Sequence, residues 1–111
     1  MIDWDRVVEL REEVGADAFD EVVELFLEEV ENGLSELPAI SDGAALSDAL
    51  HFLKGSALNL GFTDFTKLCR QDEERAVAKG AAAVDLVAIS DCYNRSKERF
   101  RAYAGTVGNA A

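Results

Sequence analysis

The only histidine of this chain, His51, is the residue best suited to chemistry. In a helix that turns by about 100° per residue, His51 lies about 140° from Leu46, the centre of an apolar face. It therefore points to solvent, where a neutral imidazole can act as a nucleophile near pH 7. Lys54, three residues later, places a positive charge within reach of any group attached to the ring. An accessible ring nitrogen with a cation beside it is what a phosphorylated histidine would need.

The surface around His51 is unusually bare for an exposed helix face. Gly55 lies one turn further on, although a glycine inside a helix costs about 1 kcal/mol relative to alanine. A missing side chain next to the ring would let another protein approach closely. We therefore predict a docking patch around His51 that includes small or apolar residues, together with Leu25, which falls off the apolar stripe of the preceding helix. The predicted patch is Ala44, Ser47, Gly55, Leu58 and Leu25.

Residue types and spacing leave an ordinary explanation open. A lone surface histidine often has no function, and a glycine in the middle of a helix can serve close helix packing. Composition and spacing do not decide between these explanations and a reactive site.

The hydrophobic periodicity is helical nearly throughout and predicts an all-α fold. Four long amphipathic helices with short joints predict an antiparallel four-helix bundle, preceded by a short lid helix, as one domain over residues 1–111. The capping signals predict the helix ends. The first helix runs from a cap at Asp3 to Gly15, the second from Asp17 to Pro38, the third from Ser41 or Asp42 to Gly61, the fourth from Thr63 to Gly80, and the fifth from about Asp85 to beyond Tyr103.

The same periodicity predicts which face of each helix is buried. Asp72 falls on the apolar face of the fourth helix, where a carboxylate requires a partner. The predicted packed residues are Trp4, Val7, Val8 and Arg11 on one side of the lid; Phe19, Val22, Val23, Phe26, Val30, Leu34 and Leu37; Leu46, Ala49, Leu50, Leu53, Ala57 and Leu60; Phe65, Leu68, Cys69 and Ala76; and Leu86, Ile89, Tyr93, Phe100 and Val107.

The segment from His51 to Ala57, HFLKGSA, closely resembles the histidine-containing phosphotransfer (HPt) domain of bacterial phosphorelays. The family pattern is roughly H-x-L-K-G-S-S/A, followed by L-G and then by L-C-x-x-L-E. Leu60-Gly61, Leu68-Cys69 and Glu73 continue it here. The motif covers residues 41–75, and the number and length of the helices extend the resemblance to nearly the whole chain. Asp72 departs from the family, which usually has an apolar residue at this position.

The resemblance implies a role for each matching residue. The histidine at the position of His51 accepts a phosphoryl group from an aspartate of a response-regulator receiver domain and passes it to another such aspartate. Lys54 then helps to hold the phosphoryl group, and Gly55 keeps the surface open to the receiver. Ser56 packs at a helix interface, and Glu73 lies near the imidazole and orients it.

Charge and cysteine content exclude several other classes of protein. A net charge of −11, with 15 of the 22 acidic residues in residues 1–53, argues against binding to nucleic acids or anionic membranes. No apolar run is long enough to span a membrane, and no secretory signal is visible, so we expect a cytoplasmic protein. Cys69 and Cys92 are then reduced, and with one histidine they do not make a zinc site.

We therefore interpret the chain as a monomeric phosphorelay intermediate and not as an enzyme. No acidic cluster surrounds His51, so no metal or other cofactor is expected here, and magnesium should belong to the partner receiver domain. The expected partners are receiver domains and a hybrid histidine kinase. One alternative is an interaction module that regulates a kinase without carrying phosphate. Another is the phosphorylation module of a chemotaxis-type kinase, which would normally continue into further domains.

Overall fold

Five α-helices make up the described part of the chain in this computed structural model, which describes the backbone of residues 1–109 and the side chains of residues 1–103. They are α1 (Trp4–Val14), α2 (Ala16–Glu36), α3 (Gly43–Asn59), α4 (Thr63–Lys79) and α5 (Leu86–Asn109). Short 3-10 turns at Leu37–Ala39 and Ala81–Ala83 join α2 to α3 and α4 to α5. The all-α prediction is confirmed.

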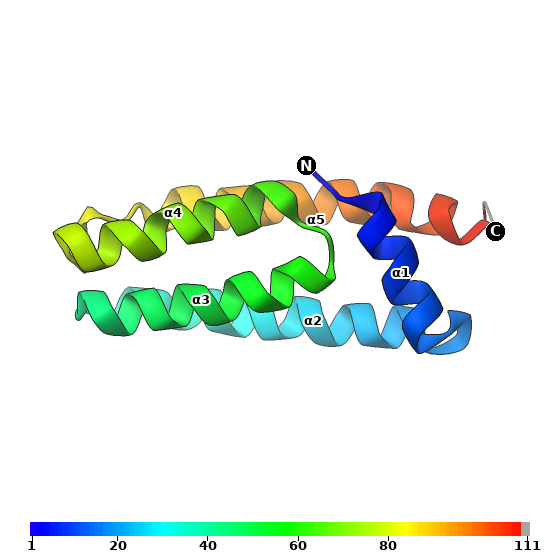
Figure 1. The fold of residues 1–111 in the computed structure, drawn as a ribbon, viewed down its shortest axis with the longest axis horizontal. Helices are drawn as coiled ribbons and strands as arrows, with labels where there is room; N and C mark the ends of the chain where they lie inside the picture. The colour runs from blue at the N-terminus through cyan, green and yellow to red at the C-terminus, as the bar shows by residue number, and fades with distance from the viewer. Residues whose placement is uncertain (110–111) are drawn as a thin grey trace.

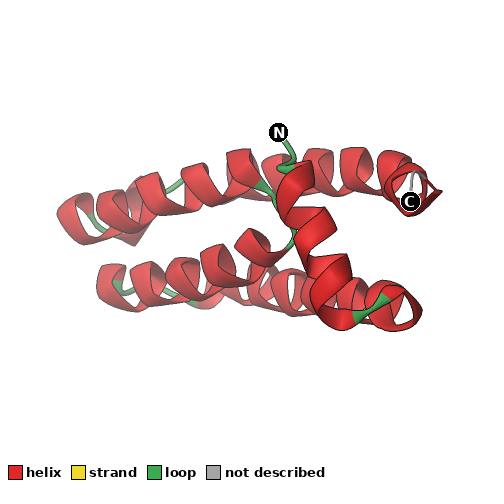
Figure 2. Cartoon of the chain, turned by 45° about the vertical axis from the view of Figure 1, so that its right-hand side comes forward, coloured by secondary structure: helices red, strands yellow, loops and turns green. Residues whose placement is uncertain are grey.

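Helices α2 to α5 run up and down along the long axis of the molecule, and α1 crosses one end of this bundle (Figures 1 and 2). The principal extents of 46 × 20 × 18 Å reflect the length of the helices. The predicted antiparallel bundle with a short N-terminal lid is confirmed. Its central apolar side chains, including Leu27, Leu50, Phe65 and Tyr93, are almost completely buried.

The lid helix α1 buries a face that differs from the predicted one, because Leu10, which was not predicted to pack, is buried and Val8 is not. Its N-cap is Asp3, whose carboxylate accepts a hydrogen bond from the Arg6 N–H at 3.2 Å, as predicted. Val7 and Leu10 are buried, whereas Val8 is 40% exposed, so the prediction that Val8 packs beside Val7 is wrong. A helix that crosses the end of a bundle buries a stripe of residues three apart, and Val8 lies beyond that stripe.

The start of α2 also differs from the prediction. Asp17 is not the N-cap, because Gly15 alone joins α1 to α2 and α2 therefore begins at Ala16. Asp17 instead lies in the first turn, where the helix dipole favours a negative charge. Leu27, which is 1% exposed, was missing from the predicted apolar stripe. Val107 lies outside the side chains that the structure describes.

The turn between α3 and α4 is fixed by the N-terminal residues. Gly61 has a φ of +72°, which favours glycine, and a Cβ there would collide with the Asp3 carbonyl oxygen. The Asp3 N–H donates to the Gly61 carbonyl oxygen at 2.7 Å, and Ile2 forms an isolated β-bridge with Phe62. This fixed turn sets the antiparallel register of α3 and α4.

Both cysteines are free and buried, as the sequence indicated for Cys69. Burial raises the pKa of the Cys69 thiol to about 12 and also raises that of Cys92. Both side chains are therefore protonated at neutral pH and serve as small apolar core residues.

Asp72 lies on the buried face of α4, as predicted, and its side chain is only 2% exposed. Its partner is Arg75, one turn further along α4, with Nη1 3.3 Å from Oδ1. Burial raises the pKa of the Asp72 carboxyl above its usual value, although the charge of Arg75 opposes this. The folded state therefore favours the protonated carboxyl more than the unfolded chain does.

We expect Asp72→Leu to stabilise the protein at pH 7 by about 1 kcal/mol, which is roughly 5 °C in Tm. The wild type loses stability as the pH rises through the raised pKa of the folded state, so the gain should shrink as the pH falls toward the ordinary aspartate pKa. Thermal unfolding of both proteins between pH 7 and the ordinary aspartate pKa measures this gain in stability, and Asp48→Leu on the exposed surface is the control. A lower Tm for Asp72→Leu at pH 7 would show that the Asp72–Arg75 pair is stabilising.

Candidate functional site

His51 lies near the middle of α3 on its solvent-facing side, and its side chain is 70% exposed. The opposite side of α3 carries the predicted core residues Leu46, Leu50 and Leu53, all nearly fully buried. The prediction that His51 points to solvent is confirmed. Because one face of α3 packs into the core, the imidazole on the opposite face is exposed to solvent.

Glu73 of α4 joins His51 to Lys54. The His51 Nδ1 lies 2.9 Å from Glu73 Oε1, and the Lys54 Nζ lies 2.8 Å from Glu73 Oε2. The side chains of Glu73 and Lys54 are only 14% and 19% exposed, so the carboxylate is held at the edge of the core beneath the imidazole. The fixed α3–α4 register places these three residues together.

This contact determines which ring nitrogen is free to react. A carboxylate only accepts hydrogen bonds, so Nδ1 of a neutral His51 must carry the hydrogen and donate it to Glu73. The lone pair then resides on Nε2, on the outer side of the ring. The arrangement orients the imidazole with its nucleophilic nitrogen toward solvent.

Gly55 leaves open space beside His51. A Cβ built on this glycine would meet no atom within 4 Å, so close helix packing does not explain why a glycine occupies this position. The ordinary explanation left open by the sequence therefore does not hold for Gly55. The bare backbone faces solvent next to the imidazole.

The structure brings most of the predicted docking patch together on α3. Ala44, Ser47, His51, Gly55 and Leu58 follow one another at three- or four-residue intervals along its outer side. Leu58 is 53% exposed, Ala44 is exposed and Ser47 is half-buried. Small or apolar residues thus extend from His51 in both directions along the outer side of α3.

Leu25 lies on a different helix from this group. It is 57% exposed, but it lies on α2, one turn before Glu29. The Glu29 carboxylate accepts a hydrogen bond from the hydroxyl of Ser56, a buried residue at the interface of α2 and α3. This alignment places Leu25 level with the end of α3 and away from His51. Its part in docking stays a prediction.

The sequence analysis missed Val77 on α4, which is 68% exposed. An open hollow of about 420 Å³ beside the site is lined by Ser47, Glu73, Glu74, Val77 and Ala78. The missed signal was the spacing of Glu73 and Val77, which places them on the same side of α4. The apolar surface next to His51 therefore extends from α3 onto α4.

Within the described residues, no group of three or more His, Cys, Asp or Glu side chains could hold a metal ion. No described helix is long and apolar enough to cross a membrane.

A comparison with known protein families identifies the family to which this chain belongs. The family model of the Hpt domain matches residues 21–99, more than two thirds of the chain. The chain belongs to the Hpt domain family. The matched region of this Hpt domain contains His51, Lys54, Gly55 and Glu73. A search of curated proteins and a search of solved structures each found no match.

Membership of the Hpt family implies histidine phosphotransfer in a phosphorelay and hence partners that belong to a phosphorelay. Hpt domains carry phosphoryl groups and are not catalysts.

Proposed function

We propose that this Hpt domain accepts a phosphoryl group on His51 from a receiver-domain aspartate and passes it to the aspartate of another receiver. The observation that carries the proposal is the imidazole itself, 70% exposed, held through Nδ1 by Glu73 and flanked by a glycine with open space beside it. The proposal treats residues 1–111 as one domain, because Met1 and Asp3, just before α1, form backbone hydrogen bonds with the α3–α4 turn. It also takes this domain to be monomeric and cytoplasmic.

The transfer is a displacement at phosphorus. The Nε2 lone pair of His51 attacks the phosphorus of the receiver's aspartyl phosphate, a bond forms between nitrogen and phosphorus, and the bond to the aspartate oxygen breaks. The electron pair of that bond leaves with the aspartate as a free carboxylate. The ring, still protonated at Nδ1, gains positive charge, which the nearby Glu73 carboxylate stabilises. Transfer to the next receiver is the reverse of this step.

Magnesium belongs to the receiver in this proposal, and Lys54 is the cation that this chain contributes. Its Nζ is paired with Glu73 Oε2 at 2.8 Å. The lysine side chain is long and has rotatable bonds, and an ammonium group donates up to three hydrogen bonds. Lys54 can therefore also contact the phosphoryl oxygens as negative charge arrives.

We expect Lys54→Ala to slow transfer from a phosphorylated receiver about tenfold while the helical content is unchanged. Loss of the cation removes stabilisation of the phosphoryl oxygens, and the exposed imidazole stays in place. Single-turnover transfer measured beside circular dichroism tests this. A natively folded variant that transfers at the wild-type rate would remove Lys54 from the mechanism.

The alternative function is an interaction module that regulates a kinase by contact alone. The open Gly55 surface would serve such a module equally well, but the half-buried Glu73 that holds His51 through one nitrogen would have no purpose in it. Kinase regulation that survives His51→Ala but is lost on mutation of the acidic face of α2 would favour the contact-only module.

The test is transfer of labelled phosphate. The purified chain is mixed with radiolabelled phospho-receiver domains and magnesium, and the label on the chain is tested for acid lability and base stability, which distinguish phosphohistidine from phosphoserine and aspartyl phosphate. Because the chain has one histidine, such a label would identify His51. No label from any receiver, with the protein folded, would favour the contact-only module.

A further inference from the structure

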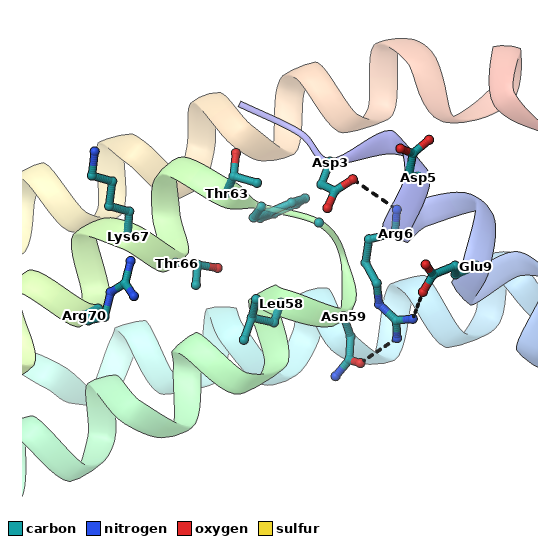
Figure 3. Close-up of a pocket in the computed structure, with 12 residues that line it drawn as sticks. Asp3, Asp5, Arg6, Glu9, Leu58, Asn59, Thr63, Thr66, Lys67 and Arg70 are labelled. Atoms are coloured by element: carbon teal, nitrogen blue, oxygen red, sulfur yellow. Dashed lines mark hydrogen bonds and ion pairs between the residues drawn. The ribbon is translucent and has the colours of Figure 1, made fainter.

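A second surface feature lies on the same side of the molecule as His51. A pocket of about 550 Å³ opens between α1, the α3–α4 turn and the first two turns of α4 (Figure 3). Leu58 and Asn59 from the end of α3 line one side, and Lys67 and Arg70 of α4 line another. None of these residues takes part in the phosphoryl chemistry described above.

The pocket is continuous with the surface around His51. Leu58 lies two helical turns beyond His51 on the same face of α3, and it lines the pocket with half of its surface exposed. On α4, Arg70 lies one turn before Glu73, the residue that holds the imidazole. A partner that covers His51 and extends toward α1 must therefore also cover this pocket.

The two charged walls of the pocket differ in how far their charges are already compensated. Three acidic and three basic residues line the pocket. Those in α1, together with Asp3 just before it, mostly contact one another. The Asp3 carboxylate caps Arg6 N–H at 3.2 Å, and the Arg6 guanidinium contacts Glu9 at 3.2 Å and Asn59 at 3.0 Å. On this wall only Asp5 is left without such a contact among the described residues.

Lys67 and Arg70, which we call the cationic edge, form no ion pair with any described residue. This contrasts with a chain whose net charge is −11 and in which acidic residues are twice as numerous as basic ones. Two exposed and uncompensated cations favour contact with a negatively charged group.

We propose that the cationic edge is a docking contact for an acidic surface of the receiver domain that exchanges phosphate with His51. This inference rests on the proposed function and adds the part of the partner that this chain recognises. Carboxylates of the receiver contact Lys67 and Arg70 while its phosphorylated aspartate faces His51. Because the neighbouring α1 wall retains the negative Asp5, a receiver turned end for end would bring like charges together. The edge thus selects both the partner and its orientation.

The test compares Lys67→Glu/Arg70→Glu with Arg95→Glu/Arg99→Glu, a pair of exposed residues on α5 outside any ion pair. Both variants change the net charge equally. With the receiver that labels the wild type fastest, we expect the α4 variant to be labelled at least about tenfold more slowly at subsaturating receiver. The α5 variant should stay within about twofold of wild type.

Two further readouts distinguish docking from chemistry. The deficit of the α4 variant should shrink in high salt, which screens surface charges, and should disappear at saturating receiver. Equal labelling rates for the two variants, or a deficit that persists at saturating receiver, would overturn the docking proposal. Labelling of His51 in the wild type would show that the proposed function itself still holds. If no receiver labels the wild type, the proposed function itself fails, and the docking contact fails with it.

Discussion

Replacing His51 by glutamine should abolish phosphoryl transfer, with a loss of at least about a thousandfold that reaches the background of the assay. Glutamine is polar and uncharged, but its amide nitrogen has no available lone pair and cannot attack phosphorus. No other histidine can take over, because His51 is the only one in the chain. Gel autoradiography with the same phospho-receivers measures the label on the His51→Gln variant. Label on this variant would show that another residue accepts the phosphoryl group.

The loss of transfer should occur without loss of stability. The His51 side chain is 70% exposed, and Glu73 keeps its ion pair with Lys54 when the imidazole is removed. Exposed substitutions of this kind change the free energy of unfolding by less than about 0.5 kcal/mol. A matching Tm and helical circular dichroism therefore form the control. A variant with a strongly reduced Tm would show instead that the His51–Glu73 contact supports the bundle.

The apolar and capping patterns predicted most of this fold because they are local. Asp42 and Thr63 start their helices as predicted, and Gly80 ends α4. Asp17 was misplaced because a single-residue joint at Gly15 depends on how α1 meets α2, which no local pattern describes. Leu27 was missed because helix periodicity gives the direction of a face and does not give the width that neighbouring helices cover.

The candidate site could likewise be predicted only in part from the sequence. The exposure of His51 follows from its angle to Leu46, and the motif placed Lys54, Gly55 and Glu73 around it. The ion pair from Glu73 to Lys54 and the positions of Val77 and Arg70 relative to α3 depend on the register of α4 against α3. That register is set by Gly61 and its contact with Asp3, far from the site in the sequence. The displacement of Leu25 from the site follows from the alignment of α2 with α3, which is equally non-local.

Gly55→Gln should raise stability and lower transfer. A Cβ at this position meets no atom within 4 Å, and glutamine is a much better helix former than glycine. The free energy of unfolding should therefore rise by up to about 1 kcal/mol. The long side chain, however, would fill the open space next to His51 that a receiver must enter. We expect transfer to fall about a hundredfold, because a misplacement of about 1 Å at the reacting atoms can cost that much.

Gly55→Ala is the matched control, because it separates helix propensity from steric obstruction. Alanine gives the full gain in helix propensity and adds one methyl group, so its Tm should rise at least as much while transfer stays within a fewfold of wild type. Thermal unfolding and single-turnover transfer of the three proteins test both effects. If Gly55→Gln is as stable as Gly55→Ala and transfers at the same rate, the receiver does not approach His51 across Gly55. If both variants lose transfer equally, backbone freedom at Gly55, and not open space, is what the reaction requires.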